Sequence, residues 1–213
     1  MPRARGLTAL ALAVALVVLA APGCGSAVGD RATADTTKPT GSTPAPVDRG
    51  PVLFLGDSLT DGAERFGDLT DRLEDAGFTA IDVVAEIGRD VDWGRAQVED
   101  MATVADLVIV ELGTNPSAEA DGFAEDAVEL VDALRARGAR HIAWLTPVHG
   151  RDDRYEEKTT ALRGIPGIVV ADWATRVKDD PRRLAADGLH PTEEGYVELA
   201  WFLVGTAIEL DVG

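Results

Sequence analysis

Short hydrophobic segments alternate with longer amphipathic segments through residues 51–213. The short segments are rich in Val, Ile and Leu and are bounded by Gly, Pro or Asp, a pattern typical of buried strands. They predict strands at residues 51–56, 80–85, 106–113, 141–146 and 167–172. Between them, apolar residues recur every three or four positions, which indicates helices. We expect these helices at residues 66–77, 93–105 and 123–138, and a last helix at 192–210 whose N-cap is Thr192.

The regular alternation of strand and helix predicts an α/β fold. Because successive parallel strands need crossover connections, the helices cover both faces of the sheet and give three α/β/α layers. We therefore expect a five-stranded parallel sheet in a flavodoxin-like arrangement. In such folds ligands bind beyond the carboxyl ends of the strands, so the residues that follow each strand are the candidates for a site.

The first 23 residues carry the pattern of a signal peptide. Two arginines precede an apolar stretch from Leu7 to Ala21 that only Thr8 interrupts. This stretch is too short to be a comfortable membrane span, which favours a cleaved signal over the alternative, a permanent N-terminal anchor helix.

Cys24, the only cysteine of the chain, follows this stretch and has no partner for an internal disulfide. Its setting resembles the lipobox of bacterial lipoproteins, although Ala21 stands where that motif usually has Leu. The resemblance implies lipidation of Cys24 and anchoring on the outer face of the bacterial cytoplasmic membrane, since more than one acyl chain gives a stable anchor. A simple secreted protein is the alternative.

After the lipidated cysteine, residues 24–50 are expected to form a disordered tether. Residues 25–50 contain no aromatic residue and consist mostly of Gly, Ala, Ser, Thr and Pro, so they cannot bury enough apolar surface to fold. Residues 51–213 then form one domain, which is large enough to have a proper core.

The chain is strongly acidic, with a net charge of −17. Removal of residues 1–23 takes away two arginines and no acid, which leaves −19. Repulsion from phosphate groups argues against nucleic acids and anionic lipid surfaces as partners. The chain has no phosphate-binding loop with Lys, no dinucleotide fingerprint and no metal-ligand spacing. We therefore expect no cofactor and no metal, and we expect a monomer.

Chemically useful residues follow the predicted strands. Ser58 follows the first strand, and the later strands are followed by Gly88 and Arg89, by Asn115, by His149, and by the pair Asp187 and His190. Because these strand ends share one edge of the sheet, they bring together a nucleophile, a base, a carboxylate and donors for an oxyanion. An Asp three residues before a His can reach the ring nitrogen that faces away from a serine. Together these groups indicate acyl transfer.

Each of these residues also has a structural interpretation. Ser58 could be an ordinary turn serine, Asn115 before a proline could belong to a turn, and His190 could be a structural histidine. His149 is the rival general base, because its strand places it on the same edge.

Four blocks of the sequence resemble those of the SGNH (GDSL) hydrolase family: "GDSLTDG" at 56–62, Gly88, "GTN" at 113–115 and "DGLHP" at 187–191. The resemblance extends over residues 51–213. It implies that Ser58 is the nucleophile, that His190 is its general base and that Asp187 orients the imidazole. It also implies an oxyanion hole made of the backbone N–H groups of Ser58 and Gly88 and the side-chain amide of Asn115.

Further segments are similar to the SGNH domain of bacterial cell-wall O-acetyltransferases: "IGRD" at 87–90, "VIVELGTN" at 108–115 and "VVADWATR" at 169–176. From this similarity Arg89 and Trp173 are candidates for the substrate cleft, and His149 is a candidate from its strand position. The remaining tryptophans, Trp93, Trp144 and Trp201, are expected in the core.

We expect an extracytoplasmic serine esterase that removes short acyl groups, acetyl foremost, from cell-envelope glycans. The first alternative is an O-acyltransferase to a cell-wall sugar, which the lack of a multi-helix membrane domain to supply acetyl groups argues against. The second is a non-catalytic lipoprotein that binds a glycan or an acyl ligand. A long-chain lipase is not expected, because the sequence has no apolar lid insertion between the strands. An α/β-hydrolase fold is not expected either, because the G-x-S-x-G motif of its nucleophile elbow is absent.

Overall fold

The computed structural model describes residues 47–115, 122–149 and 154–212. All of them belong to a compact unit that spans Pro44–Gly213. The predicted signal peptide, the predicted lipidation site Cys24 and most of the predicted tether lie outside the described residues.

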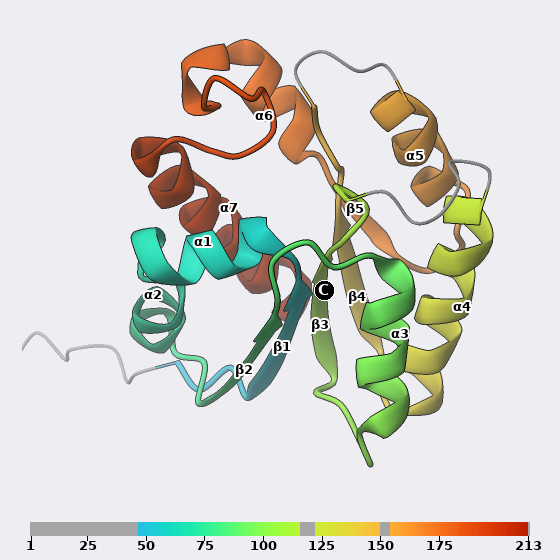
Figure 1. Cartoon of the computed structure of the whole chain (residues 1–213). Coiled ribbons are helices and arrows are strands. Elements are labelled where there is room, and N and C mark those ends of the chain that lie inside the picture. The colour runs from blue at the N-terminus through green and yellow to red at the C-terminus, as the bar shows by residue number, and fades with distance from the viewer. Residues whose placement is uncertain (1–46, 116–121, 150–153, 213) are drawn as a thin grey trace, which may run out of the picture. The chain divides into compact units, whose positions relative to one another are not determined.

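Five parallel strands form the sheet at the centre of this unit (Figure 1). In chain order they are β1 (Pro51–Gly56), β2 (Ala80–Ala85), β3 (Leu107–Glu111), β4 (His141–Leu145) and β5 (Val169–Ala171). Their spatial order is β2-β1-β3-β4-β5, and every neighbouring pair is parallel. The predicted parallel sheet is confirmed, although β3, β4 and β5 are shorter than the predicted ranges.

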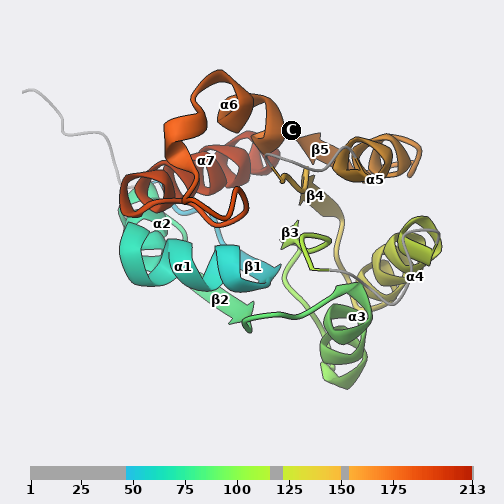
Figure 2. The same ribbon diagram turned by 45° about the horizontal axis from the view of Figure 1, so that its top comes forward.

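Helices cover both faces of the sheet, which confirms the predicted three layers (Figure 2). One face carries α1 (Ser58–Gly67), α2 (Leu69–Ala76), α6 (Trp173–Asp179) and α7 (Glu193–Asp211). The other face carries α3 (Val91–Asp100), α4 (Phe123–Ala136) and α5 (Arg154–Arg163). A short 3₁₀ helix, Pro181–Arg183, connects α6 to the loop that precedes α7.

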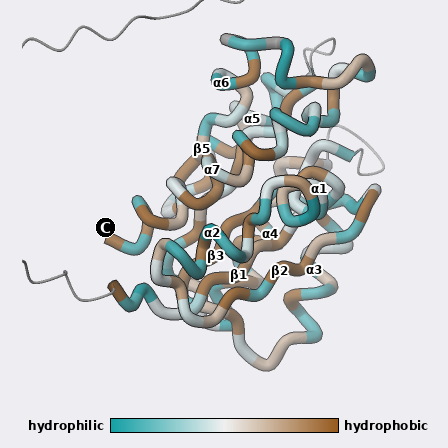
Figure 3. The backbone as a smooth tube through the Cα atoms, turned by 90° about the vertical axis from the view of Figure 1, so that its left-hand side faces the viewer, coloured by the Kyte–Doolittle hydropathy of each residue, from teal (hydrophilic) through white to brown (hydrophobic). Residues whose placement is uncertain are grey.

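Alternate residues of the central strands point to opposite faces and fill two separate cores. In β1, Val52 and Phe54 pack in the core beneath α1, α2 and α7, whereas Leu53 and Leu55 pack beneath α3 and α4. All four side chains are at most 1% exposed. Figure 3 shows the resulting hydrophobic segments along β1 and β2. Because β1 is buried on both faces, it forms a continuous apolar run instead of alternating with polar residues.

The segment predicted as one helix at 66–77 is in fact two helices, and the first begins earlier. α1 begins at Ser58 and ends at Gly67, and α2 follows after one residue. That residue, Asp68, has a left-handed φ of 50°, which Asp tolerates better than most residues and which ends the helix. Gly67 lets α1 pack closely on α7, because a Cβ there would lie 2.6 Å from the Cβ of Ala200.

The hydrophobic pattern does not predict α5 and α6. α5 is polar along most of its length, and α6 has only seven residues. The Asp172 side chain starts α6 by accepting a hydrogen bond from Thr175 N at 3.1 Å. The predicted N-cap of the last helix is present, since Thr192 Oγ1 accepts from Gly195 N at 3.1 Å.

Residues 47–50 belong to the domain, not to the tether in which we expected them. Arg49 Nε donates to Ala76 O at 2.9 Å, and Arg49 Nη1 pairs with Asp211 at 2.8 Å. Thr79 N donates to Gly50 O at 3.2 Å. These contacts place the start of the domain before β1. Among the described residues, no helix is both long and apolar enough to cross a membrane.

Candidate active site

Ser58 lies at the carboxyl end of β1, where it is the first residue of α1. Asp57 caps this helix, because its Oδ1 accepts a hydrogen bond from Leu59 N at 2.9 Å. The turn before it needs Gly56, since a Cβ at that position would lie 2.0 Å from Thr60 Oγ1. Ser58 is therefore held in a tight strand-to-helix turn, with 8% of its surface exposed.

His190 contacts Ser58 on one side and Asp187 on the other. Ser58 Oγ and His190 Nε2 are 3.0 Å apart, and His190 Nδ1 and Asp187 Oδ2 are 2.8 Å apart. Both distances are those of hydrogen bonds. The three side chains therefore form one hydrogen-bonded chain, in which Asp187 holds the imidazole by the nitrogen that faces away from the serine.

The loop that carries His190 folds around the Asp187 carboxylate. Asp187 Oδ1 accepts from Leu189 N at 2.9 Å and from His190 N at 3.1 Å. Ala185 N donates to His190 O at 2.8 Å and closes the loop. Gly188 has a φ of 76°, a left-handed conformation that glycine adopts without strain. These local contacts set the position of the imidazole over Ser58.

The environment of Asp187 keeps it ionised. The hydrogen bond from Leu189 N, followed by the bond with the His190 side chain, lowers the pKa of Asp187 to about 2. An anionic carboxylate at Nδ1 favours the tautomer with the proton on that nitrogen, which leaves Nε2 as a hydrogen-bond acceptor for the Ser58 hydroxyl.

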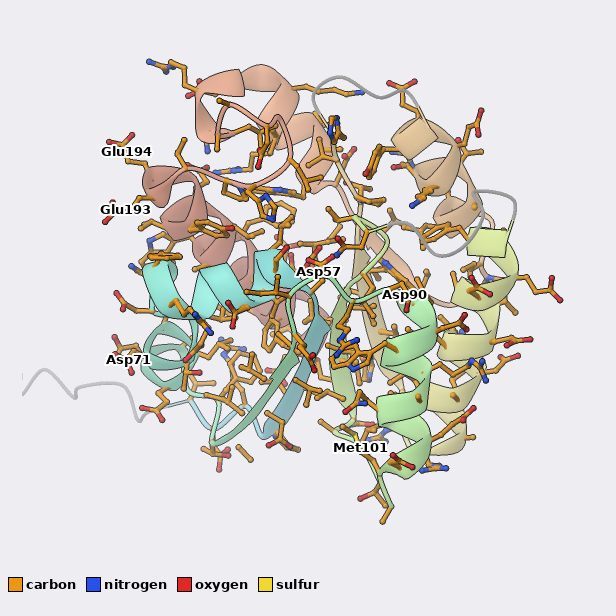
Figure 4. The ribbon with its side chains drawn as sticks, in the orientation of Figure 1. Asp57, Asp71, Asp90, Met101, Glu193 and Glu194 are labelled. Atoms are coloured by element: carbon orange, nitrogen blue, oxygen red, sulfur yellow. The ribbon has the colours of Figure 1, made fainter. Side chains whose placement is uncertain are left out.

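The loop after β2 reaches the same edge of the sheet. Figure 4 shows Asp57 and Asp90 at one end of the sheet, whereas Met101 lies at the opposite end of α3. Asp90 caps α3 by accepting from Trp93 N at 3.0 Å. Just before it, Gly88 has a φ of 80° with no atom within 4 Å of an added Cβ. The glycine is thus required by its backbone conformation, and the space beside it is open.

Asn115 ties three loops together. Its Nδ2 donates to Asp57 Oδ2 at 2.8 Å and to Arg89 O at 3.0 Å. Both N–H groups of the amide are therefore engaged within the protein. For Asn115 to act as the predicted oxyanion donor, one of these two hydrogen bonds must break so that its N–H group can bind the substrate instead.

The backbone N–H of Ser58 is available at the N-terminus of α1. The three N–H groups that follow it in α1 donate to the Asp57 side chain, the Glu111 side chain and the Asp57 carbonyl, respectively. The Ser58 N–H has no acceptor among the described residues. Because the N-terminus of a helix carries partial positive charge, this N–H is well suited to bind developing negative charge beside Ser58 Oγ.

The model of the GDSL-like lipase/acylhydrolase family matches residues 54–197. This match includes Ser58, Gly88, Asn115, Asp187 and His190. The chain belongs to this family. It is therefore an enzyme of the SGNH-type serine esterase class.

Solved structures share the fold of this acylhydrolase. The C-terminal catalytic domain of peptidoglycan O-acetyltransferase A from Streptococcus pneumoniae matches with a TM-score of 0.61 and 20% identity, over 76% of this chain and 94% of that chain. A carbohydrate esterase of family 3 from Talaromyces cellulolyticus matches with 0.61 and 22% identity, over 76% and 97%. An acetyl xylan esterase from Geobacillus stearothermophilus matches with 0.59 and 20% identity, over 74% and 94%. Among curated protein sequences, none matches.

One buried acid in the site of this acylhydrolase was not among the residues predicted from the sequence. Glu111 ends β3 and is 4% exposed. Burial, followed by the charge of Asp57, raises the pKa of Glu111 well above its usual value, and burial also raises the pKa of Asp57. An acidic residue that closes an apolar strand, as in "VIVE" at 108–111, is the signal that could have revealed it. Among the residues described, no three His, Cys, Asp or Glu side chains are arranged to hold a metal ion.

Two residues of α5 also went unnoticed, because the helix that carries them was not predicted. Tyr155 Oη donates to Thr114 O at 2.8 Å, and Lys158 Nζ donates to Gly113 O at 2.7 Å. Both carbonyls belong to the loop that carries Asn115. α5 of the acylhydrolase thus holds the loop after β3 in place.

The cleft candidates lie in different environments. His149 stacks on Tyr155, with ring centroids 5.6 Å apart, while His190 is the histidine that contacts Ser58. The geometry therefore favours His190 over His149 as the base. Arg89 pairs with Glu86, and 44% of its side chain is exposed.

Two tryptophans differ from the prediction. Trp173 is 1% exposed and packs against Phe202 in the core, with ring centroids 5.4 Å apart, so it offers no surface to a substrate. Trp201, expected in the core, is 56% exposed, and its ring lies 4.4 Å from the guanidinium carbon of Arg72. Helix periodicity alone could not place Trp201, since α7 is apolar around much of its circumference.

Proposed function

We propose that this protein hydrolyses short acyl esters, acetyl esters foremost, with Ser58 as the nucleophile, His190 as the general base and Asp187 as the orienting carboxylate. The observation that supports this proposal is the hydrogen-bonded chain from Asp187 through His190 to Ser58, with distances of 2.8 and 3.0 Å. A turn serine and a structural histidine would not require such an arrangement.

In the first half-reaction, His190 Nε2 takes the proton of Ser58 Oγ while Oγ attacks the carbonyl carbon of the ester. A tetrahedral intermediate forms, and the carbonyl oxygen becomes an oxyanion. When the double bond re-forms, the bond to the alcohol oxygen breaks, and His190 gives its proton to that oxygen. The alcohol leaves, and Ser58 carries the acyl group.

The second half-reaction repeats these steps with water. His190 takes a proton from the water as its oxygen attacks the acyl carbon. Collapse of the new tetrahedral intermediate breaks the bond to Ser58 Oγ, which regains its proton from His190. The products are the free acid and the original enzyme.

The oxyanion is stabilised in this proposal by the N–H groups of Ser58 and Gly88. Support comes from the open Ser58 N–H at the start of α1 and from the open space beside Gly88. Asn115 joins them through the N–H that contacts Arg89 O in the structure. Each such donor contributes about 3–4 kcal/mol of transition-state stabilisation in other enzymes.

We infer that the enzyme acts outside the cytoplasmic membrane on acetylated glycans of the cell envelope. The signal-peptide pattern and the lipobox-like setting of Cys24 support the location. The names of similar structures support the substrate class: a peptidoglycan O-acetyltransferase, a carbohydrate esterase and an acetyl xylan esterase.

A chain-length series of p-nitrophenyl esters tests the proposal. We expect turnover to be highest for the acetyl ester and to fall as the acyl chain lengthens. Ser58→Ala removes the attacking oxygen, so it should lower kcat by at least about 10³-fold. Absence of any Ser58-dependent turnover would instead favour a non-catalytic binding protein.

Transfer to a sugar is the second candidate, and the similarity to the catalytic domain of a peptidoglycan O-acetyltransferase favours it. The same assay separates the two when chito-oligosaccharide is added as an acceptor beside the acetyl ester. Acetylated sugar in excess over free acetate identifies a transferase, and acetate alone identifies an esterase.

A further inference from the structure

Glu111 is a buried carboxyl group that the proposed reaction does not use. Its Oε2 accepts hydrogen bonds from Thr60 N at 3.2 Å and from Thr60 Oγ1 at 3.1 Å, and Asp57 N lies at 3.4 Å. Its Oε1 accepts from Thr114 Oγ1 at 3.4 Å. One side chain thus contacts four donor groups.

These contacts join the two loops on which the chemistry depends. Asp57 and Thr60 flank the nucleophile Ser58 in the turn after β1, and Thr114 precedes Asn115 in the loop after β3. The backbone adds to the connection, since Asp57 N also donates to the carbonyl of Glu111 at 3.2 Å. Glu111 lies between both loops, at the end of a strand buried on both faces.

The contact with Thr60 N also determines which N–H groups of α1 are occupied. Thr60 N would otherwise be an unsatisfied donor in the first turn of the helix. With Glu111 and Asp57 accepting from that turn, the Ser58 N–H is the one left to face a substrate. The position of α1 along its axis, and hence of Ser58 Oγ, depends on the same contacts.

The surroundings of Glu111 suit a structural acceptor close to an oxyanion. Burial and the nearby Asp57 carboxylate raise the pKa of Glu111 well above its usual value, so this environment disfavours its ionised form. The carboxyl oxygens accept N–H and O–H hydrogen bonds, and the surroundings oppose a second negative charge behind Ser58. Asp57 from the turn and Tyr196 from α7 are the titratable groups that face Glu111.

We propose that Glu111 is a positioning residue for acyl transfer: its carboxyl group locks the start of α1 to the loop after β3, and so holds the Oγ and N–H of Ser58 in the geometry for attack and oxyanion binding. This inference rests on the proposed function of Ser58. Glu111 itself does not touch the substrate.

Two substitutions separate hydrogen bonding from charge. Glu111→Gln keeps an acceptor oxygen for Thr60 and Asp57 and places its amide next to Thr114 Oγ1, so kcat on p-nitrophenyl acetate should stay within about 3-fold of the wild type. Glu111→Met keeps the length but removes both acceptors. It should lower kcat at least 10-fold and leave KM within about 2-fold, because a small displacement of the nucleophile has a large effect on rate.

The reactivity of Ser58 supplies a second readout that does not need ester turnover. Phenylmethanesulfonyl fluoride sulfonylates an activated serine, and mass spectrometry measures its rate. Glu111→Met should slow this labelling about as much as it lowers kcat, and Glu111→Gln should not. Thr60→Val, which removes one donor to Glu111, keeps the inference testable if Glu111→Met does not fold, and it should lower kcat about 3-fold.

Leu134→Ala provides the matched control for lost stability. Leu134 is fully buried in α4, in the core on the other face of the sheet, so its truncation should lower the melting temperature without changing kcat.

The inference is overturned if Glu111→Met or Thr60→Val lowers the melting temperature but leaves kcat and labelling rate unchanged, as in Leu134→Ala. It is also overturned if Glu111→Gln is as impaired as Glu111→Met, because charge would then be essential. A wild type without Ser58-dependent turnover contradicts the proposed function alone, and the labelling rates still test Glu111.

Discussion

His190 shows how much a single contact decides at the scale of residues. Its ring lies between Ser58 Oγ and the Asp187 carboxylate, and half of the Asp187 side chain is exposed to solvent. Two backbone N–H groups donate hydrogen bonds to the Asp187 carboxylate and hold it in place despite this exposure. The orientation of the imidazole therefore depends on one small loop.

We predict that Asp187→Asn lowers kcat about 10²- to 10⁴-fold on p-nitrophenyl acetate. An amide can present an N–H group to Nδ1, which favours the tautomer that cannot accept the proton of Ser58. Asp180→Asn is the matched control, because Asp180 pairs with Arg182 and contacts none of the three residues of the hydrogen-bonded chain. An Asp187→Asn variant with kcat close to that of the wild type would show that His190 is not oriented by this contact.

The same substitution changes how stability depends on pH. The pKa of Asp187 is about 2 in the folded protein against 3.8 for the unperturbed group, so ionised Asp187 stabilises the fold above pH 3.8. This contribution is lost as the pH falls through 2. Thermal melts should therefore show the wild type more stable than Asp187→Asn at pH 6, with the gap closing toward pH 2. Solvent screening at this half-exposed side chain keeps the difference small.

At the scale of elements, α5 acts as a brace for the loop after β3. Lys158 is 9% exposed, and its ammonium group donates to Gly113 O, while its neighbour Tyr155 donates to Thr114 O. The Lys158 ammonium also lies 5.2 Å from the ring centroid of Phe123 in α4. The loop that carries Asn115 is thus held by side chains from a helix that the hydrophobic pattern did not predict.

We predict that Lys158→Met lowers kcat roughly 10-fold, because Gly113 and the residues after it lose the donor that holds them and Asn115 shifts. Steady-state kinetics with thermal melts measure both effects. Lys178→Met is the control, since it breaks an exposed ion pair between Lys178 of α6 and Glu156 of α5. It should leave kcat unchanged and alter the free energy of unfolding by no more than about 1 kcal/mol. Unchanged kcat in Lys158→Met would show that the loop keeps its position without this contact.

At the scale of the whole molecule, charge is the dominant property. The net charge of −17 leaves many carboxylates without a basic partner, and their mutual repulsion opposes the compact state. The ion pairs between described residues are mostly exposed, for example Arg140 with Asp106, and such pairs contribute little.

We therefore predict that salt stabilises this protein. Raising sodium chloride from 10 to 150 mM shortens the screening length from about 30 to about 8 Å, which weakens long-range repulsion more than short-range pairing. Relief on the order of 1 kcal/mol would raise the melting temperature by about 2–4 °C. Calorimetry at constant pH measures this shift, and a melting temperature that falls with salt would mean that ion pairs outweigh the repulsion.

Much of the fold follows from local patterning. A strand buried on both faces needs a continuous apolar run, so β1 occupies the predicted range 51–56. The edge strand β2 is half-exposed, yet its short run of Ile and Val places it at the predicted range 80–85. The pair Asp187 and His190 is also local, since three residues separate them within one loop. Helices with weak or polar patterns escape this reasoning, as α5 and α6 show.

Contacts between distant segments depend on how the layers pack. Ser58 and His190 are 132 residues apart, and Thr60 and Glu111 are 51 residues apart, yet each pair is hydrogen-bonded. The motifs point to the first contact because both residues follow strands of one sheet. No pattern along the chain points to the second, or to the two contacts that engage the Asn115 amide. Hydrophobic periodicity reports which face of an element is buried, whereas the partner of a buried polar group is set by the register and packing of the whole sheet.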